Sequence, residues 1–170
     1  MIVAIRCLDA WHAEASMTGR STKVPRPCAC TTVRKTSRRL ARVYDQALQP
    51  TALNVTQLAL LRAVVREAGK PISQVAASLS MDRTSAYRAL GTMEKRGWVV
   101  VRAGVHKRAR AAELTQAGHE VLADAAPHWD SIQTEVVRRF GVRRWQRLVA
   151  ELEELANVAD SVEQQSPEDR

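Results

Sequence analysis

Apolar residues recur at helical spacing along most of this 170-residue chain, and the stretch from Pro71 to Leu79 shows the pattern well. An apolar residue falls at i, i+3, i+4 and i+7 in this stretch, at Ile72, Val75, Ala76 and Leu79. This spacing predicts a short helix with one buried side. Pro71 suits the entry to that helix, because a missing backbone N–H costs nothing in the first turn. Ser80 and Met81 then interrupt the pattern.

A second helix is expected directly after this break. Asp82 stands where the N-cap should be, so that its carboxylate can accept backbone N–H groups of the first turn. Gly97 suits the position just past the helix end, and Lys95 and Arg96 suit the last turn, where cations favour the helix dipole. The inward stripe consists of Ala86, Ala89, Leu90 and Met93. The opposite face carries Thr84, Tyr87, Arg88 and Gly91, flanked by Arg83 and Ser85.

The residues after Gly97 predict a two-stranded hairpin. Trp98 to Val101 is a β-branched run that Gly104 follows too closely for a helix. Residues 108–114 supply the return strand, and residues 103–107 form the tip. Trp98 is expected in the core, where it closes the hairpin onto the preceding helix. Two helices joined by a tight break and followed by such a wing are the winged helix-turn-helix arrangement.

Amphipathic helices flank this module on both sides. Before it, we expect one helix over about 31–48 and another over about 56–67. After it, Thr115 is a suitable N-cap for a long helix that Pro127 should kink. Gly141 separates this helix from a last one over about 142–159. The inward stripes expected before the module are Val33, Leu40, Val43, Ala47 and Leu48, then Leu58, Leu61 and Val65.

The predicted fold is mainly α with a small β wing, a winged helix-turn-helix domain between N- and C-terminal helices. Residues 1–27 lack a sustained period and are expected to be a disordered extension, in which Met17 is an alternative start. Residues 28–160 form the domain, with the reader helix and wing at about 54–114. The outer helices, about 31–49 and 115–159, carry more apolar surface than the module needs, which favours dimerisation through them. Residues 161–170 are expected to be an acidic, flexible tail.

Charge is distributed unevenly along the chain. Counting Lys and Arg against Asp and Glu, residues 1–30 carry four and two, residues 31–110 sixteen and four, and residues 111–170 six and twelve. The net charges are therefore +2, +12 and −6, which sum to the +8 of the whole chain. The +12 segment contains the predicted reader helix, and such a patch attracts a polyanion.

The exposed face of the second helix has the chemistry to contact DNA. Arg makes bidentate contact with guanine, and Ser or Thr hydroxyls bond phosphates or base edges. We therefore predict a regulator of transcription that binds double-stranded DNA in a sequence-specific manner. The predicted DNA-binding residues are Arg83, Thr84, Ser85, Tyr87 and Arg88 in the helix, and Lys107, Arg108 and Arg110 in the wing.

Other chemistry is weakly supported by the sequence. The four histidines form no metal-ligand pair, and no phosphate loop or nucleophile motif is present, so we predict no catalysis, cofactor or metal site. Cys28 and Cys30 are either ordinary thiols or an oxidant sensor, and the odd count of three cysteines, with Cys7 as the third and no spaced second pair, argues against a disulfide framework or a four-cysteine zinc site. No apolar run reaches membrane length and no secretory signal is evident, so a cytoplasmic location is expected.

With these elements placed, residues 28–160 resemble the MarR family of bacterial winged-helix transcription regulators. The resemblance rests on MDRTSAYRALGTMEKRG, whose helix start and Met93–Gly97 ending match the family's D-R-[ST]-[ST] and L-E-[KR]-[KR]-G patterns. Leu114, Thr115 and Gly118 match the L-T-x-x-G that follows the wing. The resemblance implies a homodimer on a pseudo-palindromic operator, with the second helix in the major groove and Arg108 of the wing in the minor groove. His106 departs from the acidic residue that the family often has before this arginine.

The resemblance also implies how such a regulator is controlled. Family members are typically repressors released by a small ligand, often aromatic or phenolic, or by cysteine oxidation. No inducer can be named from this sequence, and Arg38, Tyr44 and Trp129 are candidate lining residues that packing explains equally well. Two alternatives stay open: control of the same DNA-binding fold through oxidation of Cys28 and Cys30, and a winged-helix adaptor that contacts proteins.

Overall fold

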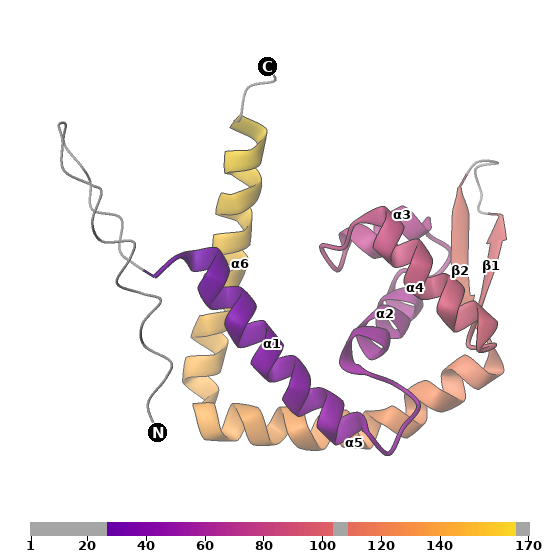
Figure 1. The fold of residues 1–170 in the computed structure, drawn as a ribbon, viewed down its shortest axis with the longest axis horizontal. Helices are drawn as coiled ribbons and strands as arrows, with labels where there is room; N and C mark the ends of the chain where they lie inside the picture. The colour runs from indigo at the N-terminus through magenta and orange to yellow at the C-terminus, as the bar shows by residue number, and fades with distance from the viewer. Residues whose placement is uncertain (1–26, 104–108, 166–170) are drawn as a thin grey trace, which may run out of the picture. The chain divides into compact units, whose positions relative to one another are not determined.

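The structure is a computed structural model that describes residues 27–103 and 109–165. The described residues form helices and one two-stranded antiparallel sheet (Figure 1). In chain order these are α1 (Ala29–Leu48), α2 (Val55–Arg66), α3 (Ile72–Ala77), α4 (Arg83–Lys95), β1 (Val99–Ala103), β2 (Arg110–Leu114), α5 (Gln116–Phe140) and α6 (Val142–Gln165). The predicted fold class, mainly helical with a β wing, is confirmed.

The chain divides into two units, residues 1–35 and 36–170, with the boundary inside α1. In the second unit, the core lies where α2, α3, α4 and the sheet meet, and residues of α5 pack against it. Leu58, Leu60 and Leu61 of α2 are fully buried there together with Ile72 and Leu90. Each such side chain contributes about 1.5–3 kcal/mol by leaving water. This core holds α3 and α4 against the sheet.

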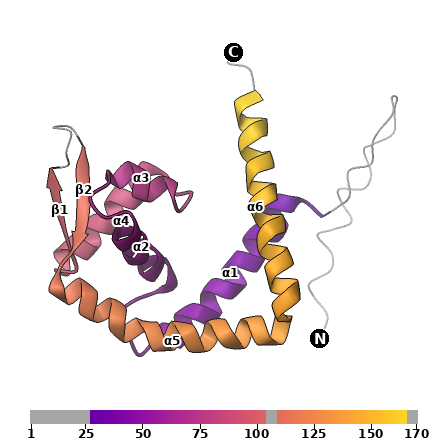
Figure 2. The ribbon, with the colours of Figure 1, turned by 180° about the vertical axis from the view of Figure 1, so that it is seen from behind.

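The hairpin is built in register, with Val99 opposite Leu114 and Ala103 opposite Arg110. β2 is the inner strand, which packs against α2 and α3, and β1 is the outer strand beside the end of α4 (Figure 2). Strand β1 begins one residue later than predicted and includes Ala103, which was expected in the tip. Strand β2 begins at Arg110. The rest of the predicted tip, residues 104–107, and Arg108 of the predicted return strand lie outside the described residues.

Two predicted apolar stripes are wrong in part. Val33, Leu40 and Val43 of α1 were expected to point inward, but they are 41%, 36% and 41% exposed. Val65 of α2 is 46% exposed, and Leu60 and Val64 are buried in its place. Helical periodicity identifies an apolar face without saying what covers it. α2 is buried on a wider side than its sequence stripe suggests, because it contacts α3, β2 and α5.

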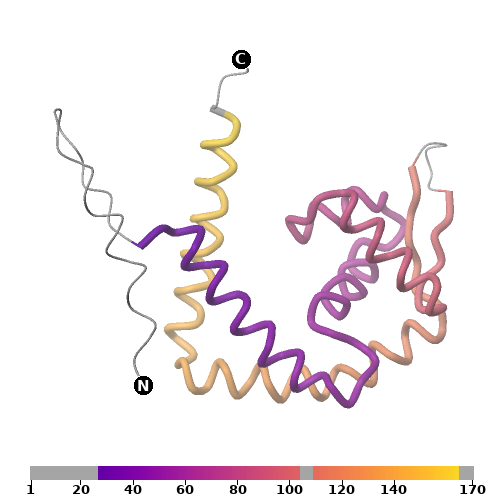
Figure 3. The backbone as a smooth tube through the Cα atoms, viewed as in Figure 1, coloured from indigo at the N-terminus to yellow at the C-terminus, as the bar shows by residue number. Residues whose placement is uncertain are grey.

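The helices after the wing follow the prediction with one difference. Thr115 is the N-cap of α5 and its hydroxyl accepts the Gly118 N–H, and Gly141 ends the helix with a φ of 98°. α5 is continuous through Pro127 and changes direction along its length (Figure 3). α6 continues to Gln165 instead of ending near residue 159, so residues 161–165 of the expected flexible tail are helical. Residues 1–26 and 166–170 are outside the described residues.

Candidate nucleic-acid interface

The start of α4 is fixed by the predicted N-cap. Asp82 has extended backbone angles, and its Oδ1 accepts the backbone N–H of Ser85 at 2.8 Å. Hydrogen bonds from Ser85, first its side chain and then its backbone, lower the pKa of the Asp82 carboxyl. The charged carboxylate therefore stabilises the positive end of the helix dipole.

The turn before α4 orients the helix. Ser80 has a φ of +50°, which only glycine adopts without cost. Its N–H donates to the carbonyl of Ala77, and the Met81 N–H donates to the carbonyl of Ala76. These two bonds form a Schellman motif that closes α3 and turns the chain sharply into α4.

The two faces of α4 are separated as predicted. Ala86, Leu90 and Met93 are at most 1% exposed and join the core. Arg83, Thr84, Tyr87 and Arg88 are exposed, and Ser85 is half-buried beside them. Neither Arg83 nor Arg88 has an ion-pair partner among the residues that the structure describes. Their guanidinium groups are therefore available to an external anion.

A second Schellman motif ends α4 and begins the wing. Gly97 has a φ of +73°, its N–H donates to the carbonyl of Glu94, and the Trp98 N–H donates to that of Met93. Trp98 is 8% exposed and lies in the core, as predicted. The guanidinium of Arg96 stacks on its ring at 4.8 Å and donates to the Ala52 carbonyl. Arg96 is thus held by contacts within the domain.

The wing carries further exposed cations. Arg110 is exposed at the start of β2, at the tip end of the hairpin, opposite Ala103. Lys107 and Arg108, the other predicted wing contacts, lie outside the described residues, as does His106. Sequence reasoning missed Arg102, which is exposed on β1 and lies 3.6 Å from the Glu113 carboxylate across the hairpin. Exposure rises from Val99 to Ala103 without alternating, so strand periodicity would not have identified Arg102 as exposed.

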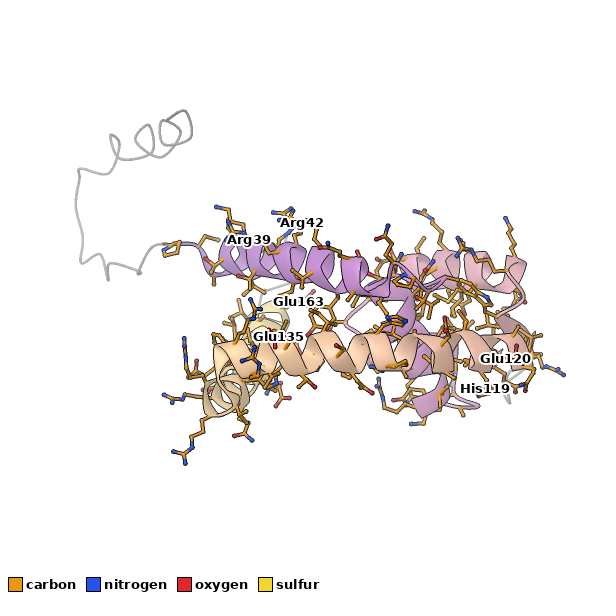
Figure 4. All side chains as sticks on the ribbon, turned by 90° about the horizontal axis from the view of Figure 1, so that it is seen from below. Arg39, Arg42, His119, Glu120, Glu135 and Glu163 are labelled. Atoms are coloured by element: carbon orange, nitrogen blue, oxygen red, sulfur yellow. The ribbon has the colours of Figure 1, made fainter. Side chains whose placement is uncertain are left out.

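Positive charge is not confined to the reader helix and wing. Five cations of the +12 segment lie exposed on α1: Arg34, Lys35, Arg38, Arg39 and Arg42. Arg39 and Arg42 point away from α5 (Figure 4). The prediction that the charge of residues 31–110 lies at the DNA-binding helix is therefore only partly right, because these five cations belong to α1 and not to α4.

The predicted ligand-lining residues have different surroundings. The buried Tyr44 hydroxyl donates to Oε1 of Gln133 at 2.5 Å, and burial raises the pKa of Tyr44. The half-buried Trp129 packs against the core, and the Arg62 guanidinium lies 4.0 Å from its ring centre. Arg38 is exposed on α1. Tyr44 and Trp129 thus join α1, α2 and α5, and Arg62 and Gln133 were not predicted.

Cys28 and Cys30 are free and exposed at the beginning of α1. Hydrogen bonds from the backbone and side chain of Thr31 lower the pKa of the Cys28 thiol. Within the described ranges, no three His, Cys, Asp or Glu side chains are grouped to hold a metal ion. No described helix combines the length and apolar character that crossing a membrane requires.

Comparison with known proteins identifies the family. A model described as MarR family matches residues 53–109, from the turn before α2 into the wing. The M. tuberculosis transcriptional regulator MosR, solved in complex with DNA, is 34% identical with a TM-score of 0.73, over 80% of this chain and 98% of that one. This chain belongs to the MarR family. It is a DNA-binding transcription regulator and not an enzyme.

Two solved structures of lower sequence identity share the fold. MepR of S. aureus, solved with DNA, is 14% identical with a TM-score of 0.66, over 78% of this chain and 96% of that one. CouR from Rhodococcus jostii RHA1, bound to p-coumaroyl-CoA, is 20% identical with a TM-score of 0.64, over 74% and 89%. The comparison with curated protein sequences found no match.

Proposed function

We propose that this MarR regulator is a homodimeric repressor that reads a pseudo-palindromic operator through α4 and the wing, and that a small aromatic or phenolic ligand releases it. The observation that carries the proposal is the division of α4 into a buried apolar face and an exposed face with two arginines that form no ion pair with a described residue. Arg83 and Arg88 would contact bases or phosphates in the major groove, with Thr84, Ser85 and Tyr87 beside them. Lys107, Arg108 and Arg110 would contact the DNA beside it through the wing.

The exposed apolar residues of α6 support the dimer. Leu152, Leu155, Val158 and Val162 are 39% to 60% exposed, and no residue of α6 whose burial is described is buried. A helix with a long unburied apolar face favours a protein partner, most simply a second copy. In a two-fold dimer the two α4 helices would enter successive turns of one DNA face, roughly 34 Å apart.

The junction of α1, α2 and α5 is the proposed ligand site. Tyr44 and Gln133 offer a hydroxyl and an amide, and Arg62 and Trp129 offer a cation and an aromatic face. An aromatic ligand with a phenol or an acid group would compete with the protein's own pairs there. CouR is solved with p-coumaroyl-CoA, which carries a phenolic ring. We expect Arg62→Ala to weaken release by salicylate-like probes without changing DNA affinity in their absence.

A second candidate for control is oxidation of Cys28 and Cys30. Both thiols are exposed, and the lowered pKa of Cys28 increases its reactive thiolate fraction. Peroxide would oxidise the pair to a disulfide, with its two oxygen atoms leaving as water. A protein carrying both Cys28→Ser and Cys30→Ser should then stay on DNA under peroxide that releases the parent. Equal release of the two proteins would exclude this mechanism.

The test of DNA reading begins with selection of genomic fragments that the purified protein retains. On the selected site, Arg88→Ala should weaken specific binding about tenfold or more, because a guanine contact contributes about 1–3 kcal/mol. Arg42→Ala removes the same charge from α1, and we expect it to leave specific binding unchanged. Equal effects of the two substitutions would show that α4 is not the reader.

A further inference from the structure

One side-chain contact joins α4 directly to the outer edge of the wing. Glu94 lies in the last turn of α4, and its Oε1 accepts the backbone N–H of Val101 in β1 at 2.9 Å. Sequence reasoning did not single out Glu94, because an exposed acid between Met93 and Lys95 resembles an ordinary solvated residue. The contact spans seven residues of sequence and crosses the break between helix and strand.

The alternation of an antiparallel ladder explains why this N–H is available. The Thr115 N–H donates to the Trp98 carbonyl, so positions 98 and 115 form a hydrogen-bonded pair. Hydrogen-bonded pairs recur at every second residue, which places Val101 at a position whose N–H points away from β2. Because β1 pairs with β2 alone among the described strands, no second described strand meets that N–H. Glu94 supplies the acceptor that the sheet lacks.

We infer that Glu94 is a positioning residue for DNA binding, which sets the direction of the wing relative to α4. The inference rests on the proposed contact between the wing and DNA. Between the two elements the chain passes only through Arg96, Gly97 and Trp98, and Gly97 has the φ of +73° that forms the bend. The buried Trp98 anchors the base of β1, and Glu94 adds a second anchor three residues farther along the strand. The buried Val99 and the packing of β2 on α2 and α3 also hold the base of the hairpin, and Glu94 adds a contact to α4 nearer the tip, which restricts the direction of β1 further.

The other polar contact across the hairpin serves a different purpose. Arg102 and Glu113 connect β1 to β2, so they hold the strands to each other and not to α4. Among the described side-chain hydrogen bonds of the hairpin, the bond to Glu94 is therefore the one that connects the wing to α4. A wing held in its binding direction loses less conformational freedom when DNA binds, and this preorganisation favours affinity.

The experiment compares two substitutions that remove the same charge. Glu94→Gln keeps an amide oxygen that can accept the Val101 N–H, and Glu94→Ala does not. We expect Glu94→Ala to bind the selected DNA site about tenfold more weakly, because a wing that is no longer held to α4 must be ordered when DNA binds. Hydroxyl-radical footprints should lose protection where the wing lies, while guanine protection by α4 persists. Glu94→Gln should behave like the parent. Glu113→Ala, an equal charge loss on the same hairpin, should keep the wing footprint.

Amide exchange measured without DNA gives an independent readout. Protection of the Val101 N–H should fall in Glu94→Ala and persist in Glu94→Gln, with the thermal midpoint of unfolding lowered by at most a few degrees in Glu94→Ala and unchanged in Glu94→Gln. The inference is overturned if both Glu94 variants keep the wing footprint, or if both lose it equally, which would indicate a charge effect. If the parent protein gives no wing footprint, the proposed contact between the wing and DNA is wrong. Exchange protection of the Val101 N–H would then still test whether Glu94 holds β1 to α4.

Discussion

Gly118 lies so close to Trp98 that a Cβ at position 118 would be 2.0 Å from the Trp98 carbonyl oxygen. Thr115 bonds the same turn twice, through its N–H to the Trp98 carbonyl and through its hydroxyl to the Gly97 carbonyl at 2.5 Å. The first turn of α5 is therefore packed directly on the point where α4 becomes the wing. This contact ties the long helix that leads to α6 to the module proposed to contact DNA.

Replacing Gly118 by alanine should destabilise the protein. The added Cβ meets a backbone carbonyl that cannot rotate away, so α5 or the base of the wing must shift. We expect a loss of about 3 kcal/mol in the free energy of unfolding, at the upper end for overpacked sites. Chemical denaturation measures it. Gly91→Ala is the matched control, because its Cβ meets nothing within 4 Å. Inside a helix that exchange should stabilise by about 0.5–1 kcal/mol. Equal denaturation midpoints for Gly118→Ala and Gly91→Ala would contradict the close approach of Gly118 to Trp98.

The two Schellman motifs around α4 differ in the residue that holds the left-handed position. Gly97 occupies the left-handed position of one and Ser80 that of the other, with φ values of +73° and +50°. A serine side chain is strained in this conformation, and glycine is not. Ser80→Gly should therefore stabilise the protein by roughly 0.5–1 kcal/mol. Ser78→Gly, at a residue with ordinary helical angles, should destabilise it. The comparison requires only thermal unfolding of the three proteins.

Asp82 should make stability depend on acid pH. Its folded-state pKa is lowered by hydrogen bonds from Ser85, so the carboxylate binds protons less readily than in the unfolded chain. Its stabilising effect is therefore present above the unfolded pKa, near 3.9, and is lost as the pH falls through the folded pKa. Asp82→Ala should lower the thermal midpoint at pH 7 by a few degrees. Asp82→Asn should keep the cap at pH 7 and flatten the decline below about pH 4. If stability falls below pH 4 in Asp82→Asn as it does in the parent, other carboxylates determine the acid dependence of stability.

Local signals in the sequence predicted local structure well. Asp82, Gly97 and Thr115 are where caps were expected, since a cap depends on a few neighbouring backbone groups. The faces of α4 were also predicted, because its partners lie within the same module. The burial of Leu60 was missed, because it depends on α2 lying at the centre of the core.

The parts of the candidate site that were missed depend on contacts across elements. Glu94 acquires its partner only when β1 folds back beside α4, and nothing in the local sequence marks that pairing. The close approach of Gly118 to Trp98 likewise joins residues from two different elements. Gly118 was noted as part of a motif, but the sequence alone did not give its physical reason.

Self-association through α6 is the remaining prediction. Leu152 and Leu155 are 39% and 42% exposed on the stripe proposed to meet the second copy. Replacing both with glutamate would place two charges in an apolar interface, and desolvating them costs more than the lost contact area. We expect a monomer at micromolar concentration by light scattering. Operator affinity should fall at least about 100-fold, because each half-site is then bound without the avidity of a dimer.

Val65→Glu is the matched control for this pair, since Val65 is equally apolar and 46% exposed but lies on α2. It should leave the dimer and the thermal midpoint essentially unchanged. A dimer that survives both α6 substitutions would place the interface elsewhere. A parent protein that is already monomeric would exclude the homodimer while leaving single-site reading by α4 open to the Arg88 test. The α6 variants therefore separate assembly from DNA recognition, because α4 and its core contacts are the same in every protein compared.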